Sequence, residues 1–235
     1  MITDMNYYKK VGKRLLIFIL TLIITLGAQA FISGKYASTR RIRTNKGMTG
    51  ASIARKILDS NGLSNVTVRE VSGELSDHYD PRSKTVNLSS DIYNGSSIAS
   101  ASVASHECGH AIQDKEGYLF LKIRSSIVPL VNFSSYAGYF AILIGLIFSL
   151  MDLVFIGIIF EVVILAFQII TLPVEFNASH RALVQLKQLD IVDSSEHSKC
   201  RGMLIAAALT YVASVATTIL QILRYVLMFR RDDDR

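Results

Sequence analysis

The chain of 235 residues has little of several things that define common classes of protein. Its two cysteines exclude a small scaffold held together by disulfides. Its three prolines and the lack of any glycine repeat exclude a collagen-like chain. Charged residues make up only 19%, below the usual proportion of about 25%, and hydrophobic residues make up 50%, so intrinsic disorder is excluded as well. The distribution of the apolar residues therefore decides the class.

The apolar residues are gathered in four blocks, each long enough to cross a bilayer. A hydrocarbon core of about 30 Å requires about 20 mostly apolar residues in a helix. The blocks are Leu15 to Ile32, Ile127 to Leu150, Leu153 to Leu172 and Met203 to Phe229. Buried core helices are the alternative, but four such runs in so short a chain favour four transmembrane helices of a multi-pass protein of the cell membrane. A signal peptide is the alternative for the first block, but the block is longer than usual and its cleavage site is weak, so we predict a retained anchor.

Counting the crossings assigns each polar segment to a side of the membrane. Only Met151 and Asp152 separate the second and third blocks, which predicts a tight hairpin. Segments 33–126 and 173–202 then share one face, and both termini and the hairpin turn lie on the other. Most basic residues flank the blocks on the first face, so the positive-inside rule favours a cytoplasmic location for it. The net charge of +6 indicates contact with anionic lipid, and no motif indicates a nucleic-acid partner.

These boundaries divide the chain into five predicted parts. They are an anchor helix (1–33), a catalytic α+β unit (34–126), a transmembrane hairpin (127–172), a helix and loop (173–202), and a final transmembrane helix with the C-terminal tail (203–235). Within the α+β unit, local patterns predict a helix over 49–62, strands over 66–71 and 84–88 with a turn at 77–81, and a helix from 98 to about 113. The predicted fold class is therefore α+β with membrane helices, the catalytic unit having the order αββα.

The last helix of this unit contains His106-Glu107-Cys108-Gly109-His110. Residues four apart lie on one helical face, so His106 and His110 can both bind one metal ion. Glu107 would lie near enough to hydrogen-bond a water molecule on that ion, and zinc lowers the pKa of such a water to about 7. This is the HExxH pattern of zinc proteases. The alternative is a chance match on an ordinary helix, which the small residues along this helix disfavour.

A third ligand must come from elsewhere, because zinc hydrolases use three protein ligands and leave a fourth position for water. The candidates on the same face of the membrane are His78, Asp114, Glu116, Glu175, His180, Asp190, Asp193, Glu196 and His197. Glu175 follows the third block, in a segment that predicts a helix continuing past Pro173. Residue chemistry alone leaves Glu175 equally consistent with a solvated carboxylate at the membrane surface.

Three segments resemble the bacterial neutral zinc metallopeptidases of the membrane, the YugP-type family. They are Asp77–Arg82, Ser105–Asp114 and Leu172–Ser179, and the resemblance extends from about 46 to 225 in the same order. It implies a gluzincin-like catalytic unit that holds one Zn²⁺ ion on His106, His110 and Glu175, with Glu107 as the general base. Two positions depart from the family pattern: Cys108 stands where valine is more usual, and His180 where arginine is expected.

The resemblance also implies an integral-membrane zinc metalloendopeptidase acting on peptides or membrane proteins. Gluzincin-like enzymes usually hold the substrate as an added strand at a sheet edge, here expected around His78 and Val86. His78 and His180 are candidates to bind the substrate and stabilise the oxyanion, although a surface histidine is the alternative for each. Neither the cleavage specificity nor the oligomeric state follows from the sequence.

Two other functions are open. An intramembrane protease is disfavoured because Asp91 and Lys115 flank the HExxH helix, which is too polar to span lipid. A non-catalytic membrane adaptor with a structural zinc site is disfavoured because such a site has no use for Glu107. Inside the blocks, Glu161 and Arg224 lie at similar depth and are predicted to form an ion pair; the alternative is that Arg224 extends to the interface and Glu161 is protonated.

Overall fold

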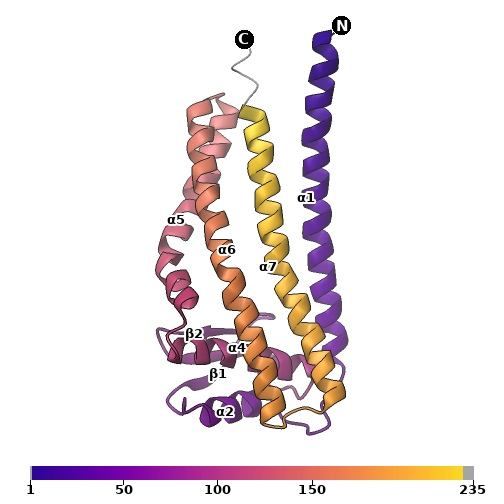
Figure 1. The fold of residues 1–235 in the computed structure, drawn as a ribbon, viewed down its shortest axis with the longest axis vertical. Coiled ribbons are helices and arrows are strands. Elements are labelled where there is room, and N and C mark those ends of the chain that lie inside the picture. The colour runs from indigo at the N-terminus through magenta and orange to yellow at the C-terminus, as the bar shows by residue number, and fades with distance from the viewer. Residues whose placement is uncertain (1, 230–235) are drawn as a thin grey trace. The chain divides into compact units, whose positions relative to one another are not determined.

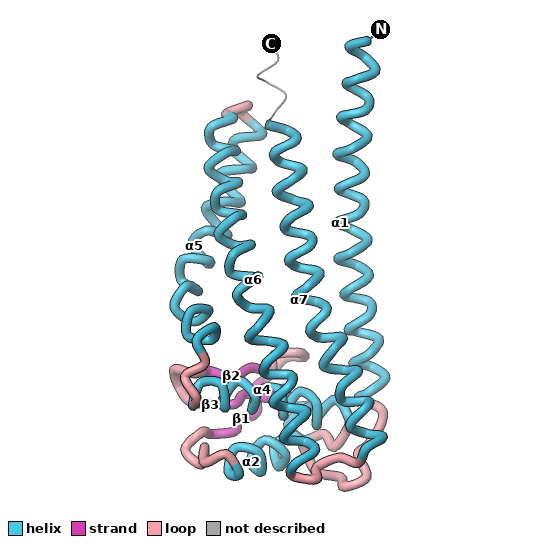
Figure 2. The backbone as a smooth tube through the Cα atoms, viewed as in Figure 1, coloured by secondary structure: helices cyan, strands magenta, loops and turns pink. Residues whose placement is uncertain are grey.

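The structure is a computed structural model that describes residues 2–229, with side chains described for residues 11–228. Helices dominate it (Figures 1 and 2). In chain order the elements are α1 (Ile2–Arg40), α2 (Gly50–Ser60), β1 (Thr67–Val71), β2 (His78–Asp80), β3 (Thr85–Ser89), α3 (Ser90–Asn94), α4 (Ile98–Lys115), α5 (Leu119–Ile147), α6 (Met151–Gln188) and α7 (Ser194–Phe229).

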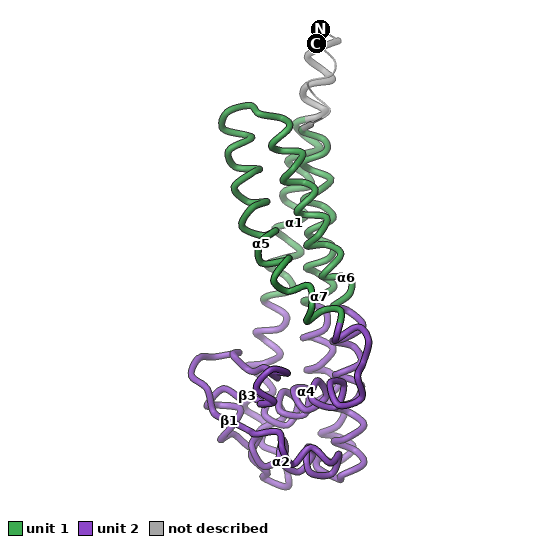
Figure 3. The backbone as a smooth tube through the Cα atoms, turned by 90° about the vertical axis from the view of Figure 1, so that its left-hand side faces the viewer, with its two compact units in different colours: residues 1–29, 123–171, 210–235 green, residues 30–122, 172–209 purple. Residues whose placement is uncertain are grey.

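The chain forms two compact units, which Figure 3 distinguishes by colour. The first unit contains the chain up to Gln29, Ile123–Thr171, and the chain from Thr210 onward. The second contains Ala30–Lys122 and Leu172–Leu209. Because α1, α6 and α7 each contribute to both units, the chain enters and leaves the second unit through helices.

Four helices are long and apolar enough to cross a membrane: Val11–Arg40, Leu119–Ile147, Met151–Gln188 and Ser194–Met228. The four predicted apolar helices are thus present, each longer than its block. In the first unit α5 and α6 approach closely at Gly157, where a Cβ would lie 2.4 Å from Ile142 Cγ1. The turn between these helices lies at 148–150, so Met151 and Asp152 already belong to α6. Asp152 lies in the first turn of α6, where the helix dipole favours a negative charge.

The predicted ion pair between Glu161 and Arg224 is not formed. The guanidinium of Arg224 instead lies over the rings of Phe18 and Tyr225, 5.6 and 5.3 Å from their centroids. Aromatic faces attract a cation through their quadrupole, so these two cation–π contacts partly replace the stabilisation that a carboxylate would give Arg224.

The second unit contains a three-stranded sheet in the order β1-β3-β2. β1 pairs in parallel with the central strand β3, and β2 pairs antiparallel with β3 along its other side. The prediction of two strands is therefore incomplete, and the turn predicted at 77–81 is wrong for residues 78–80, which form β2. His78–Asp80 becomes a strand because β3 provides a hydrogen-bonding edge, and the chain reverses only afterwards, where Lys84 has a φ of +51°.

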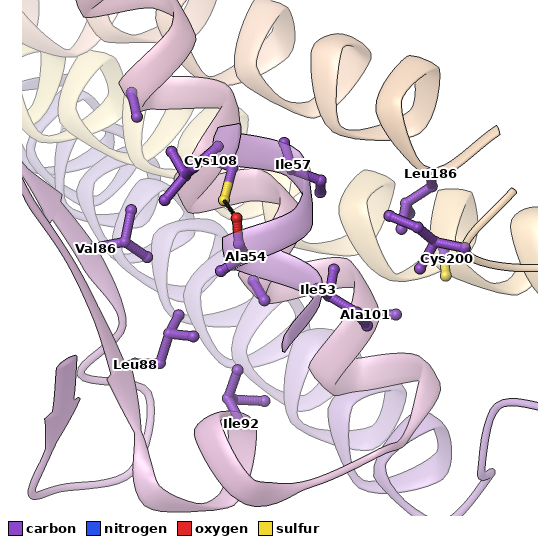
Figure 4. Close-up of a cluster of buried hydrophobic side chains, with 14 of the residues drawn as sticks. Ile53, Ala54, Ile57, Val86, Leu88, Ile92, Ala101, Cys108, Leu186 and Cys200 are labelled. Carbon is purple, nitrogen blue, oxygen red and sulfur yellow. Dashed lines mark hydrogen bonds between the residues drawn. The ribbon is translucent and has the colours of Figure 1, made fainter. Parts of the chain in front are cut away.

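The two predicted helices of this unit are present as α2 and α4, and a side chain caps the start of each. The Oγ1 of Thr49 accepts a hydrogen bond from Ser52 N, and the Oγ of Ser97 accepts one from Ser100 N. One face of α2, the central strand and one side of α4 form a single apolar core (Figure 4). Its fully buried members include Ile53, Ile57, Val86 and Leu88. Each such side chain stabilises the fold by about 1.5–3 kcal/mol, which fixes α4 against the sheet.

Candidate metal centre

Three side chains with metal-binding atoms converge in the second unit: His106, His110 and Glu175. The two histidines lie one turn apart on α4, and Glu175 lies on α6, which continues past Pro173 as the sequence predicts. One ligand atom from each residue lies within 4.8 Å of the others. The imidazole rings are nearly perpendicular, with centroids 4.7 Å apart, so the edge of one ring lies against the face of the other.

The distances within this cluster fit one small divalent cation. Glu175 Oε2 lies 3.1 Å from His106 Nε2 and 3.6 Å from His110 Nε2. Bond lengths of about 2.0–2.2 Å in a tetrahedral zinc site separate neighbouring ligand atoms by roughly 3.3 Å. Two neutral imidazoles and one carboxylate are also the donors that catalytic zinc prefers. The donor set therefore suits zinc in both chemistry and spacing.

The orientation of His110 is set by Gln113, which is fully buried one turn further along α4. The amide nitrogen of Gln113 donates to Val174 O at 2.8 Å and to Asn177 Oδ1 at 2.9 Å, so the amide oxygen faces His110 Nδ1 at 3.0 Å. An oxygen there requires the proton of the neutral ring to be on Nδ1. His110 Nε2 is left with its lone pair directed toward the cluster, as a metal ligand requires.

His106 is held in the same way from the opposite helix. Ser179 lies one turn beyond Glu175 on α6, and its hydroxyl oxygen is 3.2 Å from His106 Nδ1. This hydroxyl is the hydrogen-bond partner of Nδ1, and the other ring nitrogen, Nε2, faces Glu175. Both histidines therefore present the same nitrogen to the cluster, and a partner on α4 or α6 orients each ring.

Glu107 lies beside the cluster and is 7% exposed. Its carboxylate lies near the backbone N–H of Tyr79 in β2. Burial raises the pKa of Glu107 to about 7; the carboxylate of Glu175 adds to this increase, whereas His106 and the Tyr79 N–H oppose it. A carboxyl group that titrates near neutral pH is suited to accepting and releasing a proton.

Gly109 lets the two ligand-bearing helices approach each other. A Cβ built on Gly109 would lie 2.5 Å from the backbone oxygen of Ala178 in α6. Only a residue without a side chain permits this contact, which brings Glu175 to the histidines. The preceding residue, Cys108, points elsewhere: its Sγ lies 3.6 Å from Ala54 O in α2 (Figure 4), and burial raises the pKa of the thiol. The thiol of Cys108 is therefore turned into the apolar core.

The other candidate ligands belong to separate interactions. Asp114 accepts a hydrogen bond from the Tyr79 hydroxyl at 2.6 Å, and Glu116 pairs with Arg181 at 2.6 Å. Asp190 pairs with Lys46, Asp193 and Glu196 exchange hydrogen bonds with each other's backbone N–H groups, and His197 Nε2 lies 3.1 Å from Leu183 O.

The two remaining histidines also lie outside the cluster. The ring nitrogens of His78 face Ser76 O at 2.8 Å and Asn87 Nδ2 at 3.2 Å. His180 is exposed and lines a cavity of about 230 Å³ between α6 and α7. In the structure both histidines are at the surface of the unit, which is the alternative considered for each.

Gln113 and Ser179 have roles that sequence reasoning did not assign. Their spacing contains the signal, because Gln113 follows His110 by three residues and Ser179 follows Glu175 by four. Residues at these separations share a helical face. The signal becomes useful only once the ligands themselves are known.

The geometry agrees with the comparison to known proteins. The family model described as "Putative neutral zinc metallopeptidase" matches residues 14–230, and the chain belongs to this family. It is also similar to the "Putative membrane protease YugP" of Bacillus subtilis (strain 168), with 41% identity over 223 residues, which is 93% of this chain and 99% of the relative. No solved structure has significant similarity to the chain. The family resemblance predicted from the three motifs is therefore confirmed.

Proposed function

We propose that this protein is an integral-membrane zinc metalloendopeptidase whose single zinc ion is bound by His106, His110 and Glu175. The observation that supports this most is the convergence of these three side chains beside Glu107, a buried carboxylate that is not among the three ligands. When bound, zinc supplies a Lewis acid that polarises the scissile carbonyl and makes water acidic enough to lose a proton near neutral pH.

The chain's own residues account for the proton movements. The Glu107 carboxylate accepts a proton from the attacking water and then donates it to the nitrogen of the leaving amine. Its pKa suits this exchange, and the backbone N–H of Tyr79, the middle residue of β2, lies near its carboxylate. During these steps Gln113 keeps His110, and Ser179 keeps His106, in the orientation of a metal ligand.

The peptide substrate is proposed to add to the sheet at β2. β2 is an edge strand that pairs only with β3, and its Tyr79 N–H reaches Glu107, so this edge borders the candidate site. Main-chain hydrogen bonds to such an edge bind an extended peptide without selecting its side chains. His78 lies on this strand, whereas Val86 lies on the central strand and is not part of the edge. His78 is thus better placed than Val86 to contact the substrate.

Two features separate this proposal from a membrane adaptor with structural zinc. A structural site fills all four positions with protein ligands, whereas here the described residues offer three. A buried glutamate with a raised pKa also has no purpose in a structural site, because the unpaired carboxylate is costly to bury. The basic residues flanking the apolar blocks support a cytoplasmic location for the catalytic face.

The proposal is tested with the full chain in detergent, by zinc analysis together with cleavage of a broad peptide library. Glu107→Gln is expected to retain zinc and lose about 10²-fold or more of the activity, because it removes general base catalysis. Glu175→Ala is expected to lose zinc. Glu74→Gln is the matched control, since its side chain is exposed at 70% and pairs only at the surface. Cleavage by Glu107→Gln at the wild-type rate would refute the hydrolase, and unchanged zinc affinity of Glu175→Ala would refute the third ligand.

A further inference from the structure

Among the residues whose side chains are described, a cavity of about 480 Å³ in the first unit is lined by two arginines and by no acidic residue. Arg14 of α1 and Arg224 of α7 line it, and the rest of its wall is apolar or aromatic, including Leu15, Phe18 and Tyr225. Two positive charges thus share one apolar-walled space. A charge in such surroundings requires a partner, because its removal from water is costly.

Neither guanidinium has an ionic partner in the part of the chain that the structure describes. Arg14 Nη2 donates to the backbone oxygen of Leu227 at 2.6 Å, which satisfies one of its donors. Arg224 lies over Phe18 and Tyr225. The Nε of each arginine is shielded from solvent and has no hydrogen-bond acceptor. Because both Nε groups are closed off from the cavity, a ligand there would meet the remaining Nη groups of the two guanidiniums. Two planar guanidiniums lining one cavity are suited to a phosphate, whose oxygens accept several hydrogen bonds from such groups.

The position of the cavity along the helices indicates the source of that phosphate. Arg14 immediately precedes the first apolar block, and Arg224 lies near the end of the last one. Leu146, one residue before the end of α5, also lines the cavity. The cavity therefore lies where apolar helices reach the headgroup region of a bilayer, and its apolar wall continues along α1 into the hydrocarbon-length block. A ligand with a phosphate at one end and acyl chains at the other fits both parts.

We propose that this cavity binds the headgroup phosphate of an anionic phospholipid, with Arg14 and Arg224 contacting the phosphate and the apolar wall contacting the start of an acyl chain. The site is separate from the candidate metal centre, because all its residues belong to the first unit. Its occupant would join α1 to α7 through the charges of Arg14 and Arg224.

The test measures lipid retention by the full chain with native mass spectrometry. The purified protein is mixed with equal amounts of phosphatidylglycerol and phosphatidylcholine, and wild type is expected to retain phosphatidylglycerol preferentially. Arg14→Gln and Arg224→Gln are each expected to weaken this retention about tenfold, the loss of one charge-assisted contact. Lys13→Gln is the matched control, since Lys13 is an exposed neighbour that does not line the cavity and loses the same charge. Inorganic phosphate at millimolar concentration is not expected to displace the lipid.

Three results would overturn the proposal. Wild type without a preference for phosphatidylglycerol excludes the site, whatever the variants do. Equal losses in Lys13→Gln and the arginine variants show general surface attraction instead of a defined site. Displacement of the lipid by inorganic phosphate shows that the cavity binds free anions. Thermal unfolding in phosphatidylcholine alone shows whether each variant is folded. A variant that is unfolded there is replaced by the corresponding arginine-to-lysine variant, which keeps the charge but removes the planar group. That variant is expected to lose part of the preference for phosphatidylglycerol.

Discussion

Replacing Gly109 with alanine would test whether the close approach of α4 and α6 sets the geometry of the metal centre. The added Cβ would lie 2.5 Å from the backbone oxygen of Ala178 and 3.2 Å from its Cα. A carbon and a carbonyl oxygen in weak contact are about 3.3–3.6 Å apart, so the helices must separate by about 0.8 Å or more. Gly109 directly precedes His110, and Ala178 follows Glu175 by three residues. The displacement is therefore transmitted to the ligands on both sides.

The size of the expected effect follows from how small a displacement of its ligand atoms a metal site tolerates. Ligand positions must hold to within about 0.2 Å, so a shift of about 0.8 Å places Glu175 outside bonding range unless the site distorts. We expect zinc affinity to fall about 10–100-fold, comparable to the loss of an outer-shell partner. The strain should also lower the free energy of unfolding by about 1–3 kcal/mol. Alanine is favoured over glycine within a helix by about 1 kcal/mol, so a loss of stability can only come from the clash.

The assay is competition for zinc with a chromophoric chelator, combined with thermal unfolding of the full chain in detergent. Gly34→Ala is the matched control, because Gly34 also lies within a helix and a Cβ there meets nothing within 4 Å. Adding Ala178→Gly should not rescue the Gly109 variant, since the clash is with backbone atoms. Wild-type zinc affinity in Gly109→Ala would show that this contact does not position the ligands.

Two further predictions concern residues around the ligands. Gln113→Leu leaves His110 Nδ1 without its buried acceptor, so zinc affinity measured by the same competition should fall about tenfold or more, and an unchanged affinity would contradict the orienting role. In the metal-free protein, burial raises the pKa of Glu107 to about 7 from its ordinary value of 4.5. Between these two pH values the folded state therefore binds more protons than the unfolded state. The free energy of unfolding then falls as the pH rises. Glu107→Gln does not ionise, so at pH 8 in excess chelator it should unfold at a higher temperature than wild type. At pH 4.5 the two proteins should unfold at nearly the same temperature. An equal difference in unfolding temperature at both pH values would contradict this prediction.

The parts of the fold that the sequence predicts well are those determined by neighbouring residues. Thr49 and Asn61-Gly62 bound α2 as predicted, because capping and termination depend on the local chain. The strand His78–Asp80 was not predicted, since its three residues have the composition of a turn and become a strand only by pairing with β3. Likewise, the ring contacts of Arg224 with Phe18 depend on a helix some 200 residues away in the chain, which depth counting does not reveal.

The same distinction applies to the candidate site. The spacing of His106 and His110 is a local signal, because four residues complete about one helical turn. Glu175 lies 69 residues beyond His106, and residue chemistry left it among several carboxylates and histidines until the family resemblance selected it. The structure brings only Glu175 of those candidates to the two histidines within the described residues. The contacts of Gln113 with His110 and α6, and of Ser179 with His106, depend on how α4 packs against α6.

The separation of the ligands along the chain has a consequence for biosynthesis. His106 and His110 leave the ribosome well before Glu175, and α5 and the part of α6 that precedes Glu175 are made in between. A site that requires Glu175 is then completed only after the hairpin has been inserted and α6 has returned to the starting side of the bilayer. If the proposed metal site carries the peptidase activity proposed above, membrane insertion is the step that completes it, and a chain whose hairpin is not inserted would lack that activity.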